Sequence, residues 1–340
     1  MSRQPPPSTR VILSGVRSVT HLVYASSWLR SEVARAEGVV EVVVLDVGSG
    51  FGRARVDEPQ IREFLPRHPR LLVTTTPRAD HWKASTGLHR VLLSVGLPGT
   101  RAWVRLVGAG RGRRPQVVVI DEGIGSFGDV RSRQAAYRRQ GGSAAHTAVR
   151  TAVVTSAGRL LTDVKWSLYE RVGGGWVVRE EVAGEFRRRL TGSSPPPGRA
   201  VYATQPWPDI GVMSQSSYLA HLRAVGEQCA AVGMSFAVWP HPSEHLDRYG
   251  EFDLVAGSAP AELTREVAEA SVVIGSNSTA LLNLSAVHGT PAIRVTAPEL
   301  RRLEAALSPA QRALLDTFLP PPVPVAELRA RLDAVRLNRA

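Results

Sequence analysis

Two short motifs in this chain place ionisable side chains directly after apolar runs. Asp121-Glu122-Gly123 follows VVVI, and His241-Pro242 follows FAVWP. Continuous apolar runs are typical of buried strands in a parallel sheet, and ligands gather at the carboxyl ends of such strands. A carboxylate there can accept a proton from a hydroxyl, and a histidine can donate one to a leaving group. The sequence therefore predicts a catalytic base at the first motif and a catalytic acid at the second.

Hydroxyl side chains follow a third apolar run, SVVI. Ser276, Ser278 and Thr279 come at the start of an expected helix, where unpaired backbone N–H groups and the helix dipole attract anions. Thr204 and Gln205 close another apolar run, AVYA, and are expected to line the same site. These residues predict a binding site for a phosphate.

Each motif also has a purely structural explanation. Asp121 or Glu122 could cap the next helix, and His241 could be one of nine histidines without a catalytic task. Ser276 or Ser278 could be a simple helix cap. Taken singly, each motif is weak evidence for function.

The pattern of apolar residues predicts alternating strands and helices in both halves of the chain. In the first half, strands are expected at 10–15, 40–47, 70–75 and 116–121, with helices at 20–38 and 87–97. In the second half, strands are expected at 200–206, 235–240, 253–257, 271–276 and 291–295, with helices at 217–233, 262–270 and 278–289. This alternation predicts an α/β protein with two parallel, doubly wound sheets.

A proline-rich stretch divides the two halves. GSSPPPG cannot sit in a helix or a central strand, so it is the expected linker. The predicted organisation is an N-terminal Rossmann-like domain at 1–192, a linker at 193–199, a C-terminal Rossmann-like domain at 200–320, and a final helix at 321–340.

Composition narrows the class of protein. The chain has 340 residues and 43% hydrophobic residues, enough for two globular domains, and no run approaches the roughly 20 apolar residues of a membrane span. The first ten residues lack the apolar core of a secretory signal, and the single cysteine excludes an internal disulfide. We therefore expect a cytoplasmic protein.

The formal net charge of +12 comes almost wholly from arginine. A GC-rich coding sequence explains most of this excess of arginine. The positive charge would also attract anionic substrates or the inner face of a membrane. No nucleic-acid-binding motif, P-loop or zinc-ligand cluster accompanies the charge. We expect no nucleic-acid partner, no metal and no cofactor.

Taken in order, the motifs resemble those of the bacterial sialyltransferases, especially the polysialyltransferase and lipooligosaccharide sialyltransferase groups. That superfamily carries an acidic-acidic-Gly motif, a His-Pro motif and a Ser-Ser/Thr motif, which here match Asp121-Glu122-Gly123, His241-Pro242 and Ser278-Thr279. The phrases VVVIDEGIGSF, YATQP, WPHPSE and GSNSTALLNL are also similar, so the resemblance spans about 120–290.

The resemblance implies a GT-B fold and an inverting, metal-independent transfer from a CMP-activated nonulosonic acid to a glycan or capsular polymer acceptor. It assigns Asp121 as the base, with Glu122 beside it, and His241 as the acid or the group that stabilises the departing CMP phosphate. It places Ser278 and Thr279 at that phosphate. It also implies that the base and the acid come from different domains, and that the last helix packs back on the N-terminal domain.

Several alternatives stay open at this point. A CDP-glycerol glycerophosphotransferase also uses a strand-end histidine and a cytidine nucleotide, but Asp121-Glu122-Gly123 argues against it. A UDP-sugar 2-epimerase shares the fold but needs further acidic residues, which the sequence does not place. A basic glycan- or membrane-binding protein and a nucleic-acid binder are the alternatives that are not enzymes.

Overall fold

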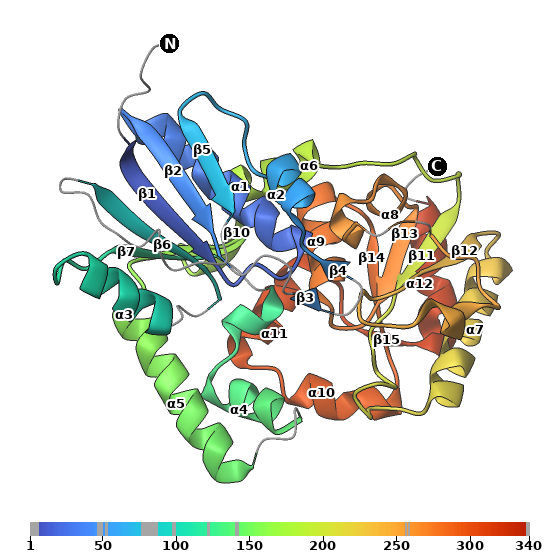
Figure 1. Cartoon of the computed structure of the whole chain (residues 1–340). Coiled ribbons are helices and arrows are strands. Elements are labelled where there is room, and N and C mark those ends of the chain that lie inside the picture. The colour runs from blue at the N-terminus through green and yellow to red at the C-terminus, as the bar shows by residue number, and fades with distance from the viewer. Residues whose placement is uncertain are drawn as a thin grey trace. The chain divides into compact units, whose positions relative to one another are not determined.

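The computed structural model (Figure 1) describes residues 7–45, 50–51, 54–75, 88–96, 100–120, 123–139, 143–255, 257 and 259–337. The chain forms two compact units. Unit 1 comprises Met1–Glu122 and Ser143–Glu185, and unit 2 comprises Gly123–Gly142 and Phe186–Ala340. The predicted boundary near 192 therefore differs from the structure, in which α6 (Glu180–Arg188) contains the boundary and a segment of the first half belongs to unit 2.

Unit 1 contains a parallel sheet of six strands in the order β5-β2-β1-β6-β7-β8. Its strands are β1 (Pro7–Ser14), β2 (Val39–Val44), β5 (Leu71–Thr75), β6 (His89–Val95), β7 (Gln116–Ile120) and β8 (Val164–Trp166). Two antiparallel pairs are β3 (Gly50–Phe51) with β4 (Ala54–Arg55), and β9 (Tyr169–Val172) with β10 (Gly175–Val178). The helices besides α6 are α1 (Val19–Arg35), α2 (Glu58–Phe64), α3 (Thr100–Ala109) and α5 (Ala144–Leu161).

Unit 2 contains a parallel sheet of five strands in the order β12-β11-β13-β14-β15. The strands are β11 (Arg199–Ala203), β12 (Ser235–Trp239), β13 (Val272–Gly275), β14 (Ala292–Thr296) and β15 (Val323–Pro324). The helices are α4 (Val130–Arg139), α7 (Gln215–Ala231), α8 (Arg265–Ala268), α9 (Thr279–His288), α10 (Arg301–Ala305), α11 (Pro309–Phe318) and α12 (Leu328–Leu337). Short 3-10 helices are η2 (Ile124–Phe127), η3 (Leu246–Tyr249), η4 (Ala261–Leu263), η5 (Pro298–Leu300) and η6 (Val325–Glu327).

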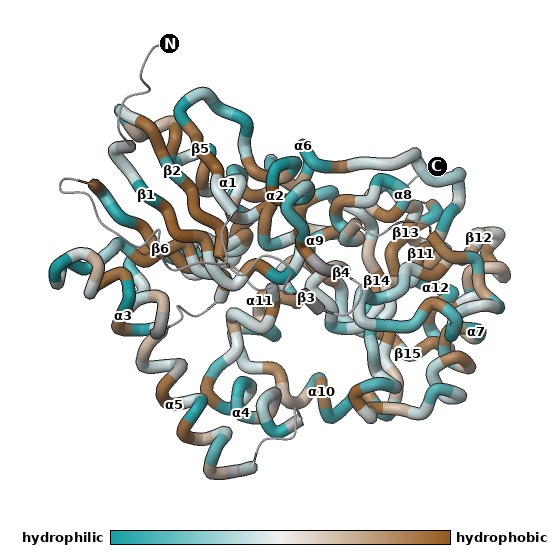
Figure 2. Tube along the Cα trace, in the orientation of Figure 1, coloured by the Kyte–Doolittle hydropathy of each residue, from teal (hydrophilic) through white to brown (hydrophobic). Residues whose placement is uncertain are grey.

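In both sheets consecutive strand residues are buried, as is expected of parallel strands that are covered by helices on both faces. In β7 and β13 successive residues are buried instead of alternating, and the hydropathy colouring of Figure 2 is brown along most of β2 and in the second half of β1. The predicted α/β class with two Rossmann-like units is therefore confirmed.

Three local predictions were wrong. The segment expected as a helix at 87–97 is strand β6, which lies in the middle of its sheet. The strand expected at 253–257 is reduced to one bridge between Leu254 and Val238. The last helix, α12, was expected to return to the N-terminal domain, but Leu328 and Leu332 are buried in the core of unit 2, where α12 packs on α7.

A buried carboxyl group in unit 2 should make stability depend on pH. Glu262 of η4 is buried, and its Oε1 accepts a hydrogen bond from Asn283 Nδ2 at 3.1 Å. Burial raises the pKa of this carboxyl above its usual range. The unfolded chain then releases the proton at a lower pH than the folded chain, so stability falls as pH rises between the two pKa values.

Replacing Glu262 by Gln should remove this loss of stability. Glu262→Gln keeps an oxygen for Asn283 and cannot ionise, so its melting temperature should exceed that of the unmodified protein at pH 7 and approach it near pH 4. Thermal melts across this pH range measure the effect, with Glu227→Gln on the exposed side of α7 as the control. Equal melting curves for Glu262→Gln and the unmodified protein at pH 7 would contradict the prediction.

Candidate functional site

The predicted site residues of unit 2 lie along the carboxyl edge of its sheet. Thr204 follows β11, His241 follows β12 by one proline, and Ser276 follows β13. The chain runs from β11 to β12 on one side and then returns to β13 on the other, so the strand order reverses at β11. In open α/β sheets, ligands bind at the carboxyl ends of the strands where this reversal occurs.

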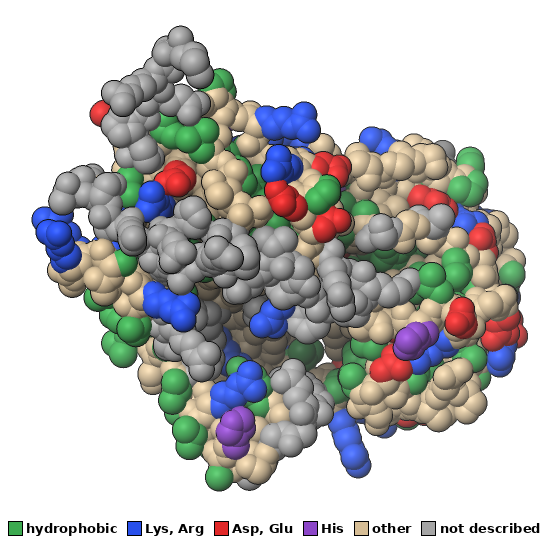
Figure 3. Space-filling view, viewed as in Figure 1, with side chains coloured by type: hydrophobic (Ala, Val, Ile, Leu, Met, Phe, Trp, Pro, Cys, Tyr) green, Lys and Arg blue, Asp and Glu red, His purple; other side chains and the backbone are tan. Residues whose placement is uncertain are grey.

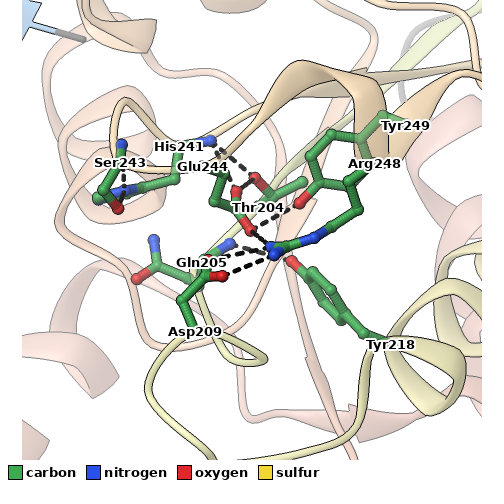
Figure 4. A network of polar contacts seen from close by, with 9 residues as sticks. All are labelled: Thr204, Gln205, Asp209, Tyr218, His241, Ser243, Glu244, Arg248 and Tyr249. Atoms are coloured by element: carbon green, nitrogen blue, oxygen red, sulfur yellow. Dashed lines mark hydrogen bonds and ion pairs between the residues drawn. The ribbon is translucent and has the colours of Figure 1, made fainter. Parts of the chain in front are cut away.

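A buried carboxylate joins the ends of β11 and β12 (Figure 4). Glu244 Oε2 accepts hydrogen bonds from the Thr204 hydroxyl and from the backbone N–H of His241, the latter at 3.0 Å. Glu244 Oε1 accepts from the Tyr249 hydroxyl at 2.6 Å and from Arg248 Nη1 at 3.2 Å. Thr204 Oγ1 also accepts the His241 N–H at 2.8 Å. Thr204 therefore holds the loop that carries His241, in addition to any contact with a ligand.

Arg248 supplies the positive charge that lets this carboxylate stay buried. Its guanidinium also donates to Asp209, from Nη2 to Oδ1 at 2.6 Å and from Nη1 to Oδ2 at 3.1 Å. These hydrogen bonds lower the pKa of Asp209 and raise that of Arg248. Burial, followed by the nearby Glu244 charge, raises the pKa of Tyr249, so its hydroxyl stays a donor. Both oxygens of Glu244 are thus hydrogen-bonded and an arginine lies beside them, as a buried carboxylate requires.

The local chain fixes which nitrogen of His241 is a donor. The backbone N–H of Ser243 donates to His241 Nδ1 at 3.2 Å, and Ser243 Oγ lies 2.7 Å from the same nitrogen. An N–H group can only donate, so Nδ1 acts as an acceptor. A neutral His241 ring then carries its proton on Nε2. Pro240 and Pro242 restrict the backbone on either side of the histidine.

Helix α9 begins beside this edge with its N-terminal hydroxyls in different roles. Ser278 is the N-cap and accepts the N–H of Leu281 at 3.0 Å, while Gly289, with φ of 67°, ends the helix. The N–H groups of Thr279 and Ala280 belong to the first turn of the helix, and N–H groups in a first turn have no hydrogen-bond partner inside the helix. Ser276, just before the cap, is 4% exposed. The structure thus gives Ser278 the capping task.

The acidic motif leads directly into a contact with this helix. Asp121 and Glu122 lie outside the described residues, but the residue that follows them, Gly123, has φ of 84° and lies against Thr279. A Cβ at position 123 would come 2.6 Å from Thr279 Oγ1, so a larger residue would clash. The same Oγ1 accepts the N–H of Ile124 at 3.1 Å. Gln311 Nε2 and Ser308 Oγ bind the carbonyls of Ile124 and Phe127, at 3.0 and 3.1 Å.

A cavity of about 300 Å³ lies within unit 2 at this edge. Its apolar wall consists of Ile124, Trp207, Ile210, Leu300, Leu303, Ala306 and Leu307. Its polar groups come from Ser132, Arg133, Ser276, Asn277 and Gln311, and none of the described residues that line it is acidic. Two buried polar atoms of this lining, Ser276 Oγ and Trp207 Nε1, have no hydrogen-bond partner within the described part of the chain. An apolar pocket with a few convergent polar groups is typical of a small-molecule site.

A second arginine supports the loop between β13 and α9. Arg294 of β14 is 4% exposed and donates to the carbonyl of Pro320 at 2.8 Å and to Asp316 Oδ1 at 2.8 Å. Its Nη1 lies 3.5 Å from Asn277 Oδ1. Within the ranges that the structure describes, no group of three or more His, Cys, Asp or Glu side chains could hold a metal ion.

The structure brings several predicted residues together and adds others. Thr204 and His241 are linked by hydrogen bonds, and Gly123 contacts Thr279, whereas Gln205 donates its N–H to the Tyr218 hydroxyl at 3.0 Å. The prediction missed Glu244, Arg248, Tyr249 and Trp207. Glu244 stands three residues after His241, and this spacing was the available signal.

Comparisons with known proteins bear on the fold. No protein-family model matches the chain, and no curated protein matches it. A structure described as a UDP-N-acetylglucosamine 2-epimerase from Listeria monocytogenes is similar, with a TM-score of 0.55 and 9% identity over 98% of this chain and 89% of that one. The chain has the GT-B fold.

Two glycosyltransferases match at lower similarity. The spinosyn forosaminyltransferase SpnP has a TM-score of 0.44 and 15% identity over 96% of this chain and 90% of that one. The E. coli heptosyltransferase WaaC, solved with ADP, has a TM-score of 0.38 and 12% identity over 85% of this chain and 88% of that one. These likenesses carry no residue roles.

Changing the buried carboxylate to an amide should disrupt the His241 loop. In the native protein both oxygens of Glu244 accept hydrogen bonds. In Glu244→Gln an NH2 group, itself a donor, takes the place of one oxygen and faces donors. Arg248 also loses one of the two carboxylates that it pairs with. We expect a loss of about 3 kcal/mol in the free energy of unfolding, measured by denaturant titration.

The exposed pair Arg223–Glu251 offers a matched control. Glu251→Gln breaks a bidentate ion pair at the surface, so its unfolding midpoint should stay close to that of the unmodified protein. A Glu244→Gln variant as stable as Glu251→Gln would show that the network contributes nothing.

Proposed function

We propose that this protein is a glycosyltransferase that takes its sugar from a nucleotide-activated donor bound by unit 2. The observation that carries this proposal is the unpartnered, buried Ser276 Oγ, which lines the cavity next to the N-terminus of α9. A buried hydroxyl without a partner costs free energy unless a ligand satisfies it. The helix N-terminus offers further N–H donors and a favourable dipole for an anion.

The cavity suits a nucleotide in two respects. Its volume lies at the lower end of the range for ligand pockets, about 300–1,000 Å³. The aromatic and aliphatic wall at Trp207, Leu300 and Leu303 offers surface for a base, while Ser276 and Asn277 lie on the side that leads to α9. The phosphate would then bind Ser276 Oγ and the N–H groups of Thr279 and Ala280.

The resemblance in sequence supports a finer proposal, that the donor is a CMP-activated nonulosonic acid. In this proposal Asp121, assisted by Glu122, removes the proton from an acceptor hydroxyl of a glycan or capsular polymer. The acceptor oxygen forms a bond to the anomeric carbon as the bond to the phosphate oxygen breaks, and CMP leaves with the electron pair. The configuration inverts because the acceptor attacks opposite the leaving group. No metal takes part.

His241 acts on the leaving group in this proposal. The neutral ring presents Nε2–H as a donor, because Nδ1 accepts from Ser243. By donating a hydrogen bond, such a group stabilises the negative charge that develops on the departing phosphate. In this proposal His241 donates this hydrogen bond and does not transfer its proton completely. Thr204 and Glu244 position the histidine through its backbone N–H.

Because the fold is similar to that of a UDP-sugar 2-epimerase, epimerisation is a second candidate function. A UDP-sugar 2-epimerase would use the same nucleotide pocket and would release the epimerised sugar without an acceptor. A CDP-glycerol transferase remains the alternative among envelope enzymes.

A donor assay separates these candidates. The purified protein is incubated with CMP-sialic acid, CDP-glycerol or UDP-N-acetylglucosamine, each with and without galactose-ended or sialylated acceptors, and nucleotide release is measured. The finer proposal expects CMP release from CMP-sialic acid that the acceptor stimulates. Release from CDP-glycerol alone, or epimerisation of the UDP-sugar, would move the function to the corresponding alternative.

The catalytic roles predict the effect of two substitutions. His241→Ala and Asp121→Ala should each lower turnover by about 100-fold to 10,000-fold while the protein stays folded. His245→Ala is the matched control, because this histidine is exposed four residues further along. It should keep turnover near that of the unmodified protein. Retained activity in His241→Ala or Asp121→Ala would remove that residue from the mechanism.

The two serines at α9 should separate ligand binding from stability. Ser276→Ala removes a hydroxyl that bonds no described protein group, so CMP affinity, measured by calorimetry, should fall about tenfold with no loss of melting temperature. Ser278→Ala removes the helix cap and should cost about 1 kcal/mol of stability. Unchanged CMP affinity in Ser276→Ala would place the phosphate elsewhere.

A further inference from the structure

Helix α5 of unit 1 has an unusual distribution of side chains. The buried side of the helix carries Thr147 and Thr151, each 1% exposed, and Thr151 Oγ1 donates to the Thr147 carbonyl at 2.6 Å. The outward side carries Val149, Val153 and Leu160, which are 65%, 55% and 74% exposed. A surface helix of a globular protein normally has the opposite arrangement.

The three exposed apolar residues form one stripe. Their spacing of four and seven residues places them on the same face of a helix. The 18 residues of α5 extend over about 27 Å, and the stripe occupies its outward side. Figure 3 shows hydrophobic side chains following the outer edge of this helix.

Basic side chains border the stripe. Arg159 is exposed on α5 itself, and Arg111 and Arg113 are exposed in the turn after α3. This turn lies beside the end of α5, because Arg114 donates to the Leu161 carbonyl at 3.1 Å and to Asp163 at 2.7 Å. Neither α3 nor α5 contains an acidic residue.

We infer that Val149, Val153 and Leu160, together with Arg111, Arg113 and Arg159, form a docking surface for an anionic membrane; we name it the α5 surface. A helix with an exposed apolar face and bordering arginines inserts that face into the lipid headgroup region, while the arginines bind anionic headgroups. The complementary charge favours a lipid surface over a neutral partner. Within the described ranges, no helix is both long and apolar enough to cross a bilayer.

Vesicle flotation tests the inference on the full chain. The protein should float with vesicles of equal parts phosphatidylglycerol and phosphatidylcholine, and this binding should weaken with added salt. It should stay behind with vesicles of phosphatidylcholine alone. Failure to float with phosphatidylglycerol vesicles at low salt would overturn the inference.

Two sets of variants locate the contact. Val153→Asp with Leu160→Asp should weaken vesicle binding about tenfold or more, because the apolar stripe gains charges that anionic lipid repels. Replacing Arg111, Arg113 and Arg159 by Gln should weaken binding about fivefold for each arginine. The controls are Leu337→Asp and Arg329→Gln on α12, since Leu337 is 71% exposed and Arg329 is also exposed.

The control variants should bind vesicles like the unmodified protein, and melting temperatures check that every variant folds. Vesicle binding by Val153→Asp with Leu160→Asp that equals the control would overturn the inference. So would light scattering that shows a dimer in the unmodified protein and a monomer in this variant, because the stripe would then bind a second copy. CMP release in solution does not depend on this surface, so the donor assay and the flotation test can fail independently.

Discussion

The carboxylate of Glu244 is the interaction on which the site of unit 2 depends. It receives hydrogen bonds from Thr204 at the end of β11, from the backbone of His241 after β12, and from Arg248 and Tyr249 of η3. One buried charge therefore ties two strand ends and the following turn. Removing a charge of this kind leaves several donors unpaired at once, so the position of His241 and the stability of unit 2 are coupled.

The architecture could be predicted because parallel strands covered on both faces are apolar throughout. This signal is strong in VVVI before position 121 and in VVI before Ser276. It fails where a strand and a buried helix look alike, as in His89–Val95, which sits between β1 and β7 and is buried because of its neighbours. It also fails at 253–257, where pairing is reduced to one bridge despite an apolar pattern.

The candidate site was predictable where its residues stand at strand ends, as Thr204, His241 and Ser276 do. It was not predictable where tertiary contacts define a residue's task. A glutamate in a loop is normally expected to be exposed to solvent. Glu244 is buried because four donors converge on its carboxylate, and the sequence does not show this convergence. Likewise, Trp207 follows β11 by four positions, but the cavity that it lines also includes Ile124 and Gln311, which are 187 positions apart in the chain.

The place of Gly123 changes how the motifs relate to one another. The sequence assigns the acidic motif to the first half of the chain, but the boundary between the units falls between Glu122 and Gly123. Gly123 lies against Thr279, and Thr279 accepts the next N–H. Glu122 is bonded directly to Gly123, and Asp121 precedes Glu122, so the chain itself keeps the proposed acidic groups within two residues of a glycine that contacts the proposed phosphate site. If Asp121 is the base, this covalent link supplies part of the proximity between base and donor that catalysis requires.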